Sequence, residues 1–237
     1  MIILKFIVEA NIGAGKSSLI STIRTQREDL ISALYEKIKT PVKIYCEKEP
    51  TREWEPFLKQ YYTTYSNEDF LRLQLIIYTS LFKRENLLSE HFKMSKDKKE
   101  IAICFLERDM DSGENFFYQP SIPSKDSQIL KEVSHILRSN SWFHKEPKHY
   151  IFIDSEPETC LSRIQARQNS SDSQIPLSLL LTLNERYQKF FTNTPHFHLS
   201  SNVRSQIHEN SSCMQQFILP IILDLLRKHE YGKYSKN

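Results

Sequence analysis

Short apolar runs alternate with longer amphipathic segments along the whole chain. The runs are rich in β-branched and aromatic residues and are shorter than a typical helix, so they predict strands. Continuous apolar runs of this kind are typical of parallel strands whose two faces are both buried. The predicted strands cover residues 2–8, 42–46, 101–106, 150–154 and 197–199.

The segments between these strands carry apolar residues at helical spacing. The segment 70–92 contains no proline or glycine, and Pro157 fits the first turn of another helix. Because strands alternate with helices, we expect an α/β fold with a five-stranded parallel sheet that helices cover on both faces. The predicted helices cover residues 19–38, 70–92, 127–143, 157–167, 177–191 and 213–228.

The first predicted strand leads into a glycine-rich turn that opens the first predicted helix. Two of the four glycines of the chain, Gly13 and Gly15, lie in this turn, which continues as Lys16-Ser17. The pattern resembles the phosphate-binding loop G-x-x-x-x-G-K-[ST], except that Ala10 stands at the first glycine position. An alanine is tolerable there only if its φ is negative.

This turn predicts a phosphate site because successive backbone N–H groups at a helix N-terminus bind anionic oxygens. Lys16 would add a positive charge for the outer phosphates, and the Ser17 hydroxyl is suited to ligate Mg²⁺. The candidate ATP and phosphate-binding residues are Glu9, Ala10, Asn11, Ile12, Gly13, Ala14, Gly15, Lys16, Ser17 and Ser18.

Charged residues also follow the second and third predicted strands, and ligands of such sheets bind at the carboxyl ends of the strands. Glu49 is the candidate general base, although a lone glutamate is more often a surface carboxylate. Glu107 is a candidate metal carboxylate, and Arg108 a candidate cation for the transferred phosphoryl group. We expect Asp154 to be structural rather than a second metal ligand.

Arg163 and Arg167 lie four residues apart and therefore share one face of a predicted helix. They are candidates for a lid over the phosphates. The alternative is that both arginines only decorate an exposed helix.

Together these segments resemble the deoxynucleoside kinase family. The motifs that carry the resemblance are Glu9 to Ser17, Glu49 to Trp54, Gln74, Glu107-Arg108 and Pro157 to Arg167. The resemblance implies a P-loop kinase fold in one domain, 1–237, with a lid at about 163–176. It also implies transfer of a phosphoryl group from ATP to the 5′-hydroxyl of a deoxynucleoside.

The resemblance further implies roles for individual residues. Glu49, Glu107, Arg108 and Lys16 would be catalytic, and Ser17 with Glu107 would hold Mg²⁺, either directly or through water. Tyr62 competes with Tyr65 for a place at the sugar. The implied nucleoside-binding residues are Glu49, Trp54, Tyr62, Gln74, Ile77, Leu81, Arg108, Gly113 and Asp172.

Several positions depart from the family pattern. Leu81 and Gly113 stand where the cytidine- and guanosine-preferring members carry an arginine–aspartate pair. This departure favours thymidine and other pyrimidine deoxynucleosides, or a broad specificity. Asp109 replaces a serine, and Asn169 replaces a lid arginine.

Composition limits the remaining possibilities. The formal net charge of +3 is too small to favour a nucleic-acid partner, and no stretch reaches the length of a membrane span. The first predicted strand starts at once, so we expect a cytoplasmic protein without a targeting segment. The family resemblance implies a homodimer formed by two long helices of each subunit.

Two other functions remain open. A nucleoside monophosphate kinase of the thymidylate type would need cations for the phosphate of its acceptor, and the Glu49 carboxylate would repel that phosphate. A nucleotide-binding protein without turnover is compatible with the departures at Ala10, Asp109 and Asn169.

Overall fold

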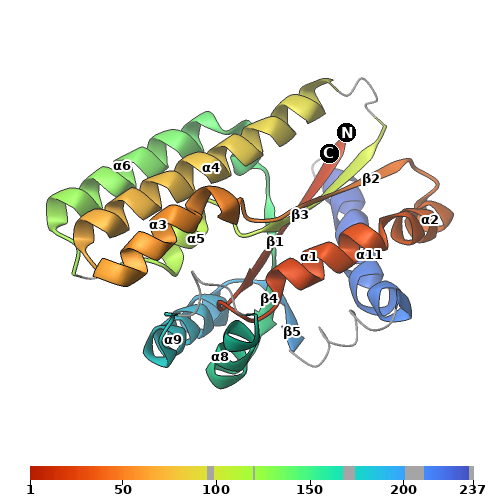
Figure 1. The fold of residues 1–237 in the computed structure, drawn as a ribbon. Coiled ribbons are helices and arrows are strands. Elements are labelled where there is room, and N and C mark those ends of the chain that lie inside the picture. Colours follow the sequence, from red (N-terminus) through yellow and green to blue (C-terminus); the bar gives the residue numbers. More distant parts are fainter. Residues whose placement is uncertain (95–98, 120, 168–173, 201–210, 235–237) are drawn as a thin grey trace.

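The computed structural model describes residues 1–94, 99–119, 121–167, 174–200 and 211–234. Its centre is a five-stranded parallel sheet with the strand order β2-β3-β1-β4-β5, which confirms the fold class expected from the sequence (Figure 1). The strands are β1 (Ile2–Ala10), β2 (Val42–Glu47), β3 (Ile101–Glu107), β4 (Lys148–Asp154) and β5 (His196–Ser200).

The strand register places the candidate residues at one edge of the sheet. In β1, Val8 pairs with Glu107 of β3, and Ala10 pairs with Ile153 of β4. The carboxyl ends of these strands therefore coincide, and the loops that follow them meet above the same edge.

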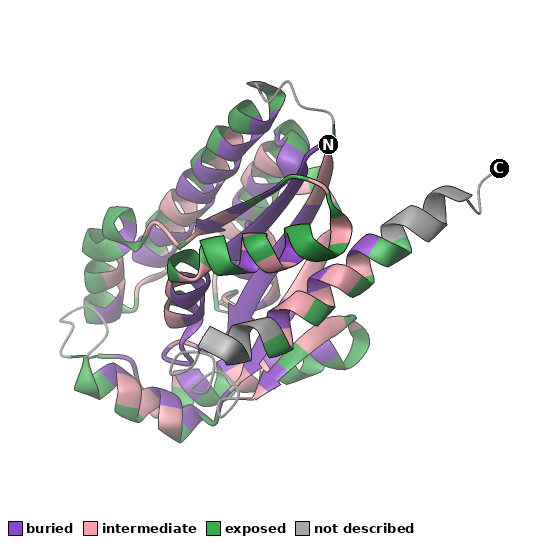
Figure 2. Cartoon of the chain, turned by 90° about the vertical axis from the view of Figure 1, so that its right-hand side faces the viewer, coloured by how far each residue is buried: buried purple, intermediate pink, exposed green. Residues whose placement is uncertain are grey.

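Helices cover both faces of the sheet (Figure 1). One face carries α1 (Lys16–Thr25), α2 (Arg27–Ile38) and α11 (Ser211–Tyr234). The opposite face carries α4 (Asn67–Met94), which packs against α6 (Ser124–Asn140) and α7 (Trp142–Lys145). The strands between these layers are largely buried, as the purple ribbon of Figure 2 shows.

Alternation along β1 divides the core into two layers. Leu4, Phe6 and Val8 point toward α1, α2 and α11, whereas Ile7 points toward α4 and α7. The ring of Phe6 stacks on a phenylalanine of the neighbouring strand at a centroid distance of 4.9 Å. Two layers of apolar side chains of this kind are what hold helices against both faces of a sheet.

β1 also carries two charged residues in the core, Lys5 and Glu9. The Lys5 ammonium donates to the carbonyls of Phe143 at 2.6 Å and His144 at 3.0 Å, so it anchors α7 to the sheet. Burial lowers the pKa of Lys5 to about 8. Glu9 belongs to the candidate site and is described below.

Some helix boundaries differ from the prediction. The helix expected over 19–38 is two helices, because the chain leaves helical geometry at Gln26, where ψ is 18°. The helix expected over 127–143 likewise ends at Asn140, and Ser141 then caps the short helix α7. Two further helices were not predicted, α3 (Thr51–Thr64) and α5 (Asp111–Asn115).

The remaining helices are α8 (Pro157–Ala166) and α9 (Leu177–Asn193). They contact each other beside the carboxyl ends of the strands. Pro157 occupies the first turn of α8, as predicted. None of the helices in the part of the chain that the structure describes combines the length and apolar composition that a membrane crossing requires.

Candidate active site

The candidate phosphate loop contains two glycines whose backbone lies in the left-handed region of φ/ψ space. Gly13 has φ of +82° and Gly15 has φ of +103°. A Cβ at Gly13 would lie only 2.5 Å from the carbonyl oxygen of Cys160 in α8, so this position requires glycine for space as well as for conformation. Ala10 lies at the end of β1 and is not among the residues with positive φ, so its side chain does not prevent the turn.

Side chains of the loop hold it against its surroundings. The Asn11 amide donates to the carbonyl of Leu180 in α9 at 2.8 Å, and its oxygen accepts from the N–H of Ile12 at 2.9 Å. The Lys16 ammonium donates to the carbonyls of Ala10 and Asn11, each at 3.1 Å. Burial, together with the nearby Arg108, lowers the pKa of Lys16 to about 8.

Ser17 and Glu107 bring two candidate metal ligands together. The Ser17 hydroxyl donates to Oε1 of Glu107 at 2.7 Å across the gap between α1 and the end of β3. Ser17 is exposed, whereas Glu107 is buried. Burial and the neighbouring Glu49 carboxylate raise the pKa of Glu107, because both disfavour its negative charge.

Arg108 joins the candidate base to the core of the site. Its Nη1 lies 2.8 Å from Oε1 of Glu49, and its guanidinium lies 4.4 Å from the ring centroid of Phe117. Burial lowers the pKa of Arg108, but Glu49 and Glu9 more than offset this effect and raise it overall. The backbone of Arg108 has φ of +53°, a conformation that costs energy for a residue with a side chain.

Glu9 is buried beside Arg108. Its carboxylate accepts from the hydroxyls of Ser112 and, at 3.4 Å, Tyr187, and it lies 3.9 Å from Nε of Arg108. Burial raises the pKa of Glu9 to about 8, although the arginine and the Ser112 hydroxyl lower it. The side chain of Glu9 therefore contacts Arg108 and the loop after β3.

A cavity of about 350 Å³ connects the two groups of candidates. At one end it is lined by the loop residues Ile12, Gly13, Gly15, Lys16 and Ser17. Toward the other end lie the nucleoside candidates Glu49, Trp54, Tyr62, Gln74, Ile77, Leu81, Arg108 and Gly113. One continuous cavity thus reaches from the phosphate loop to the predicted nucleoside residues.

The far end of the cavity is mainly apolar and closely packed. The Trp54 indole donates to the Ser80 hydroxyl at 2.6 Å, which fixes the ring against α4. A Cβ at Gly113 would lie 2.8 Å from Cε1 of Tyr78 and 3.1 Å from Oε1 of Gln74. That Gln74 oxygen is buried and accepts no hydrogen bond from the described residues, so it is available to a ligand donor.

Tyr62 and Tyr65, the two candidates for a place at the sugar, differ in their burial and contacts. Tyr62 is buried and lines the cavity, whereas the hydroxyl of Tyr65 donates to the carbonyl of Gln174 at 3.4 Å and its side chain is half-exposed. The geometry therefore favours Tyr62. Asp172 and Asn169 lie outside the described residues.

The two lid candidates have different positions. Arg167, just after α8, lines the cavity. Arg163 lies in α8, and its Nη1 donates to the carbonyl of Ala14 at 3.5 Å. Ser18 follows the loop in α1 and is half-buried.

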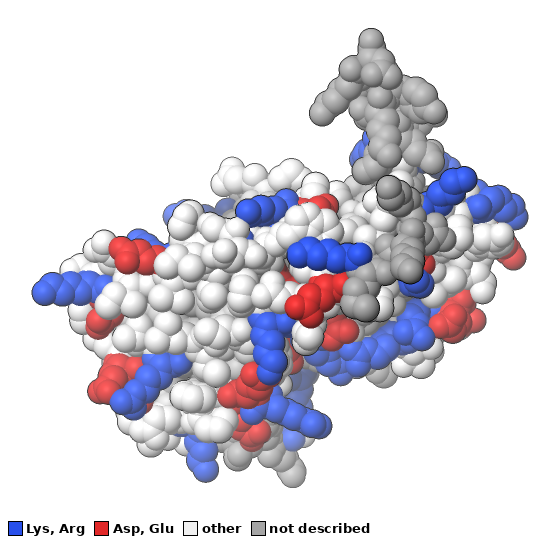
Figure 3. Space-filling model, turned by 90° about the horizontal axis from the view of Figure 1, so that it is seen from above, with Lys and Arg blue, Asp and Glu red and all other residues white. Residues whose placement is uncertain are grey.

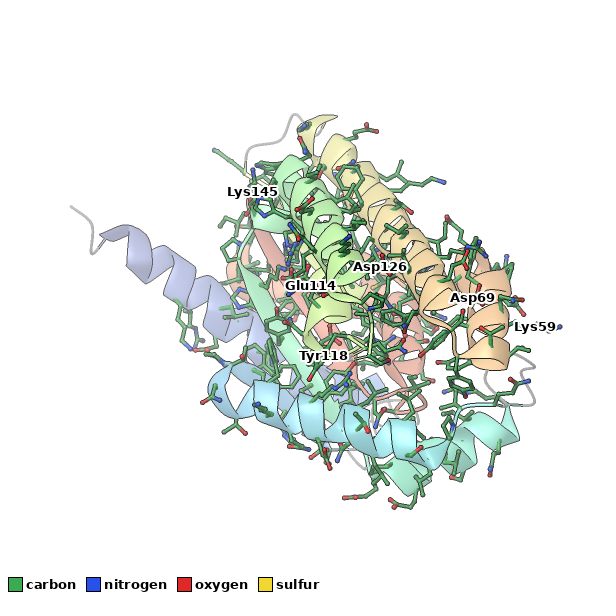
Figure 4. All side chains as sticks on the ribbon, turned by 90° about the vertical axis from the view of Figure 1, so that its left-hand side faces the viewer. Lys59, Asp69, Glu114, Tyr118, Asp126 and Lys145 are labelled. Atoms are coloured by element: carbon green, nitrogen blue, oxygen red, sulfur yellow. The ribbon has the colours of Figure 1, made fainter. Side chains whose placement is uncertain are left out.

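Arg186 of α9 is a cavity residue that the sequence analysis missed. Its Nη1 donates to the carbonyls of Phe116 at 2.6 Å and Tyr118 at 2.8 Å. Its guanidinium covers the Tyr118 ring at 3.9 Å, and Figure 4 shows Tyr118 next to α9. A single arginine in an amphipathic helix gives no sequence signal that distinguishes this position from a solvated one.

Asp109, which departs from the family serine, has a partner in this chain. Its carboxylate lies 2.6 Å from the ammonium of Lys148 at the start of β4, and one of its oxygens accepts from the N–H of Asp111 at 3.0 Å. The backbone N–H of Asp109 donates to the Ser112 hydroxyl at 3.1 Å. These contacts fix the turn that follows Arg108.

Comparisons with known proteins identify the family of the chain. The family model described as deoxynucleoside kinase matches residues 6–219. Human deoxycytidine kinase is 24% identical over 200 residues, which cover 78% of this chain and 74% of that protein. Deoxyguanosine kinase of Dictyostelium discoideum is 27% identical over 188 residues, which cover 78% of this chain and 57% of that protein. The chain therefore belongs to the deoxynucleoside kinase family.

Proposed function

We propose that this chain transfers a phosphoryl group from ATP to the 5′-hydroxyl of deoxynucleosides. The observation that carries the proposal is one continuous cavity that is lined by the phosphate loop, by Glu49 and Arg108, and by Gln74 with its neighbours. Phosphoryl transfer needs positioning and charge stabilisation more than covalent chemistry, and this arrangement can provide both.

In this mechanism Glu49 takes the proton of the 5′-hydroxyl. Arg108 orients the carboxylate through their 2.8 Å contact and also stabilises the charge that develops on the transferred group. Lys16 lies at the loop end of the cavity, where its ammonium can exchange the carbonyls of Ala10 and Asn11 for phosphate oxygens.

Ser17 and Glu107 fit a magnesium ion. Their oxygens lie 2.7 Å apart and are hard ligands of the kind that Mg²⁺ prefers. Among the described residues no cluster of three or more His, Cys, Asp or Glu could hold a metal alone. Mg²⁺ commonly takes its remaining ligands from water and nucleotide phosphates, and when bound it neutralises phosphate charge.

We propose that the lid spans about 163–176 within a single domain of residues 1–237. Support comes from Arg167, which lines the cavity, and from Arg163, which contacts the phosphate loop. In this arrangement both arginines would contact the donor phosphates when the lid closes.

We further propose a preference for thymidine and other pyrimidine deoxynucleosides. Leu81 and Ile77 line the cavity near Gln74 with apolar side chains. Gly113 lies beside them, and the Tyr78 ring occupies the space next to its Cα. An exocyclic amino group, which adenine, guanine and cytosine carry and thymine lacks, would find no carboxylate on Gly113 to accept from it. Gln74 remains to bind the edge of the base through its amide.

The test is an assay of ADP formation with Mg·ATP and a panel of deoxynucleosides and monophosphates. We expect turnover with deoxynucleosides and the highest kcat/KM with thymidine. A tenfold higher kcat/KM for deoxyguanosine than for thymidine would contradict the preference. Turnover with thymidylate alone would favour a monophosphate kinase, and ATP binding without ADP formation would favour a binding protein.

A homodimer is also part of the proposal. Ile129, Val133 and Ile136 form an apolar stripe along α6, because they follow each other at intervals of four and three residues. The side chains of Ile129 and Ile136 are 47% and 58% exposed, and α6 packs beside the long helix α4. A self-complementary contact between two such faces would bury the stripe.

A further inference from the structure

We infer that Arg84 of α4 is a positioning residue that joins the loop of the candidate base to the loop of Glu107 and Arg108. The inference rests on the proposed function, since it concerns the same reaction. Arg84 does not line the cavity, and no family motif quoted above includes it. Arg84 lies ten residues after Gln74, and in the sequence nothing distinguishes it from the other charged residues of the same long helix.

The guanidinium of Arg84 donates to backbone carbonyls of both loops. Its Nη1 donates to Lys48 at 3.3 Å and to Glu107 at 2.8 Å, and its Nη2 donates to Arg108 at 2.6 Å. Lys48 directly precedes the candidate base. One side chain therefore connects the backbone before Glu49 with the backbone of the two charged residues that face it.

These contacts begin where the sheet ends. The last pair between β2 and β3 joins Glu47 to Leu106, so the backbone carbonyls that follow lie beyond the β2–β3 pairing and need other donors. Arg84 supplies donors to the next carbonyls of both strands. It thereby extends the connection by one residue beyond Glu47 and by two residues beyond Leu106.

The connection matters because the Arg108 backbone is strained. A φ of +53° persists in a residue with a side chain only when its surroundings hold it there. Arg84 binds the Arg108 carbonyl from one side, and the Ser112 hydroxyl accepts from the next N–H from the other side. Without Arg84 we expect the Arg108 backbone to relax and its guanidinium to leave Glu49.

The chemistry of the contact requires an arginine. A planar guanidinium with hydrogens in one fork can bind several carbonyls at fixed angles, whereas an ammonium is a point charge. Among the ion pairs of the described residues, none includes Arg84, and its side chain is buried. Its role is therefore a crosslink of backbone groups and not a surface ion pair.

The experiment compares Arg84→Met, Arg84→Ala and Arg84→Lys, with Lys83→Met as the control on the exposed side of the same helix. A shift of the base by about 1 Å can lower a rate by 10²-fold, so we expect kcat with thymidine to fall by about 10–10² in Arg84→Met. The KM for ATP should stay near that of the wild type, because Arg84 donates no hydrogen bond to the phosphate loop, residues 9–18. Lys83→Met should keep the wild-type kcat.

Two further readouts separate positioning from folding. Free guanidinium, far below denaturing concentrations, should restore part of the kcat of Arg84→Ala, whereas methylammonium should not. Arg84→Lys should fold but recover little of the rate. A crystal structure of Arg84→Met should show Arg108 with a negative φ and without its contact to Glu49.

The inference is overturned if Arg84→Met keeps the wild-type kcat, or if its structure keeps Arg108 at a positive φ. It is also overturned if the loss of rate follows the thermal stability of the variants and guanidinium restores nothing. If the wild type itself forms no ADP, the proposed function fails, while the Arg108 conformation in Arg84→Met still decides the structural inference.

Discussion

At the scale of single residues, the carboxyl edge of the sheet gathers buried charges around Arg108. Glu9, Lys16 and Glu107 all carry a displaced pKa, and burial is the largest cause for each of them. Displaced pKa values of this kind mark functional sites because desolvated charges are held there for chemistry. Glu9 differs from the other two, since its contacts lie below the cavity.

We predict that Glu9 makes the stability of the fold depend on pH. Its pKa is raised from an ordinary value of about 4.3 to about 8, so the folded state holds a proton that the unfolded state releases. Stability from this proton is complete below the unfolded pKa and is lost as pH rises through about 8. The slope is at most about 1.4 kcal/mol per pH unit.

The measurement is the free energy of unfolding in urea at several pH values between 5 and 9, with Glu9→Gln as the matched variant. The wild type should lose stability relative to Glu9→Gln as the pH rises. Parallel curves for the two proteins would contradict the prediction.

A second residue-scale prediction concerns Gly113. An added Cβ would lie 2.8 Å from the buried Tyr78 ring, so Gly113→Ala should lower the free energy of unfolding by about 1–3 kcal/mol. It should also raise the KM for thymidine, because Gln74 must move, while the KM for ATP stays unchanged. A second substitution, Tyr78→Leu, makes space and should recover part of both losses. Wild-type stability and an unchanged thymidine KM in Gly113→Ala would contradict the close packing of Gly113 against Tyr78 and Gln74.

At the scale of elements, a charged cluster fixes α5 against β4 and α6. Lys148 lies 2.6 Å from Asp109 and also pairs with Asp111, which in turn lies 2.7 Å from Nη1 of Arg138. Burial raises the pKa of Asp111, but its contacts with His144 and Lys148 lower it more strongly, below its usual range. This cluster holds the short helix that carries Ser112 and Gly113 to the cavity.

We predict that Lys148→Met destabilises the protein by about 3–5 kcal/mol, because two carboxylates lose their cation in a partly buried place. The control is Lys228→Met, whose pair with Asp224 is exposed and should contribute about 0–1 kcal/mol. The loss in Lys148→Met should shrink below about pH 4, because the lowered pKa of Asp111 stabilises the folded wild type less as the unfolded carboxyl takes up its proton. Equal unfolding free energies for the two variants would refute the structural role of the cluster.

The sequence predicted the strands better than the helices. Five buried apolar runs have a clear pattern, and all five are strands. α3 was not predicted; Pro50 occupies its N-cap position and Pro56 lies within it, and proline is disfavoured inside helices. The break between α1 and α2 at Gln26 could not be predicted, because no proline or glycine lies there.

The site shows a similar limit. Residues that belong to contiguous motifs, such as Lys16 and Glu49, could be selected from the sequence because their neighbours identify them. Arg84 and Arg186 could not, because their partners are backbone carbonyls that any sequence supplies. The turn of Glu9 toward Ser112 likewise depends on how β1 and α5 meet.

At the scale of the whole molecule, the surface charges and the exposed apolar residues indicate which kind of partner the chain can bind. On the face shown in Figure 3, Lys and Arg are interspersed with Asp and Glu, and that face carries no field of one sign. The helices α4 and α6 form one side of the molecule in Figures 1 and 4, and the apolar stripe of α6 belongs to this side. Another copy of the chain suits such a surface better than a nucleic acid does.

We predict that Ile136→Asp converts a dimer into a monomer, because a charge in the apolar stripe would lose its water when the dimer buries the stripe. The control is Tyr35→Asp, which places the same charge on α2, where the side chain is 50% exposed. Light scattering at micromolar concentration measures both. A monomeric wild type, or a dimeric Ile136→Asp, would exclude this interface.

The central claim is that Glu49 is the base of a deoxynucleoside kinase, and the rate of Glu49→Gln tests it most directly. The amide keeps the size of the side chain and a contact with Arg108, but it cannot accept the 5′-hydroxyl proton. We predict that kcat for thymidine phosphorylation falls by about 10²–10⁴ while ATP still binds. A Glu49→Gln enzyme that phosphorylates thymidine at the wild-type rate would contradict the account.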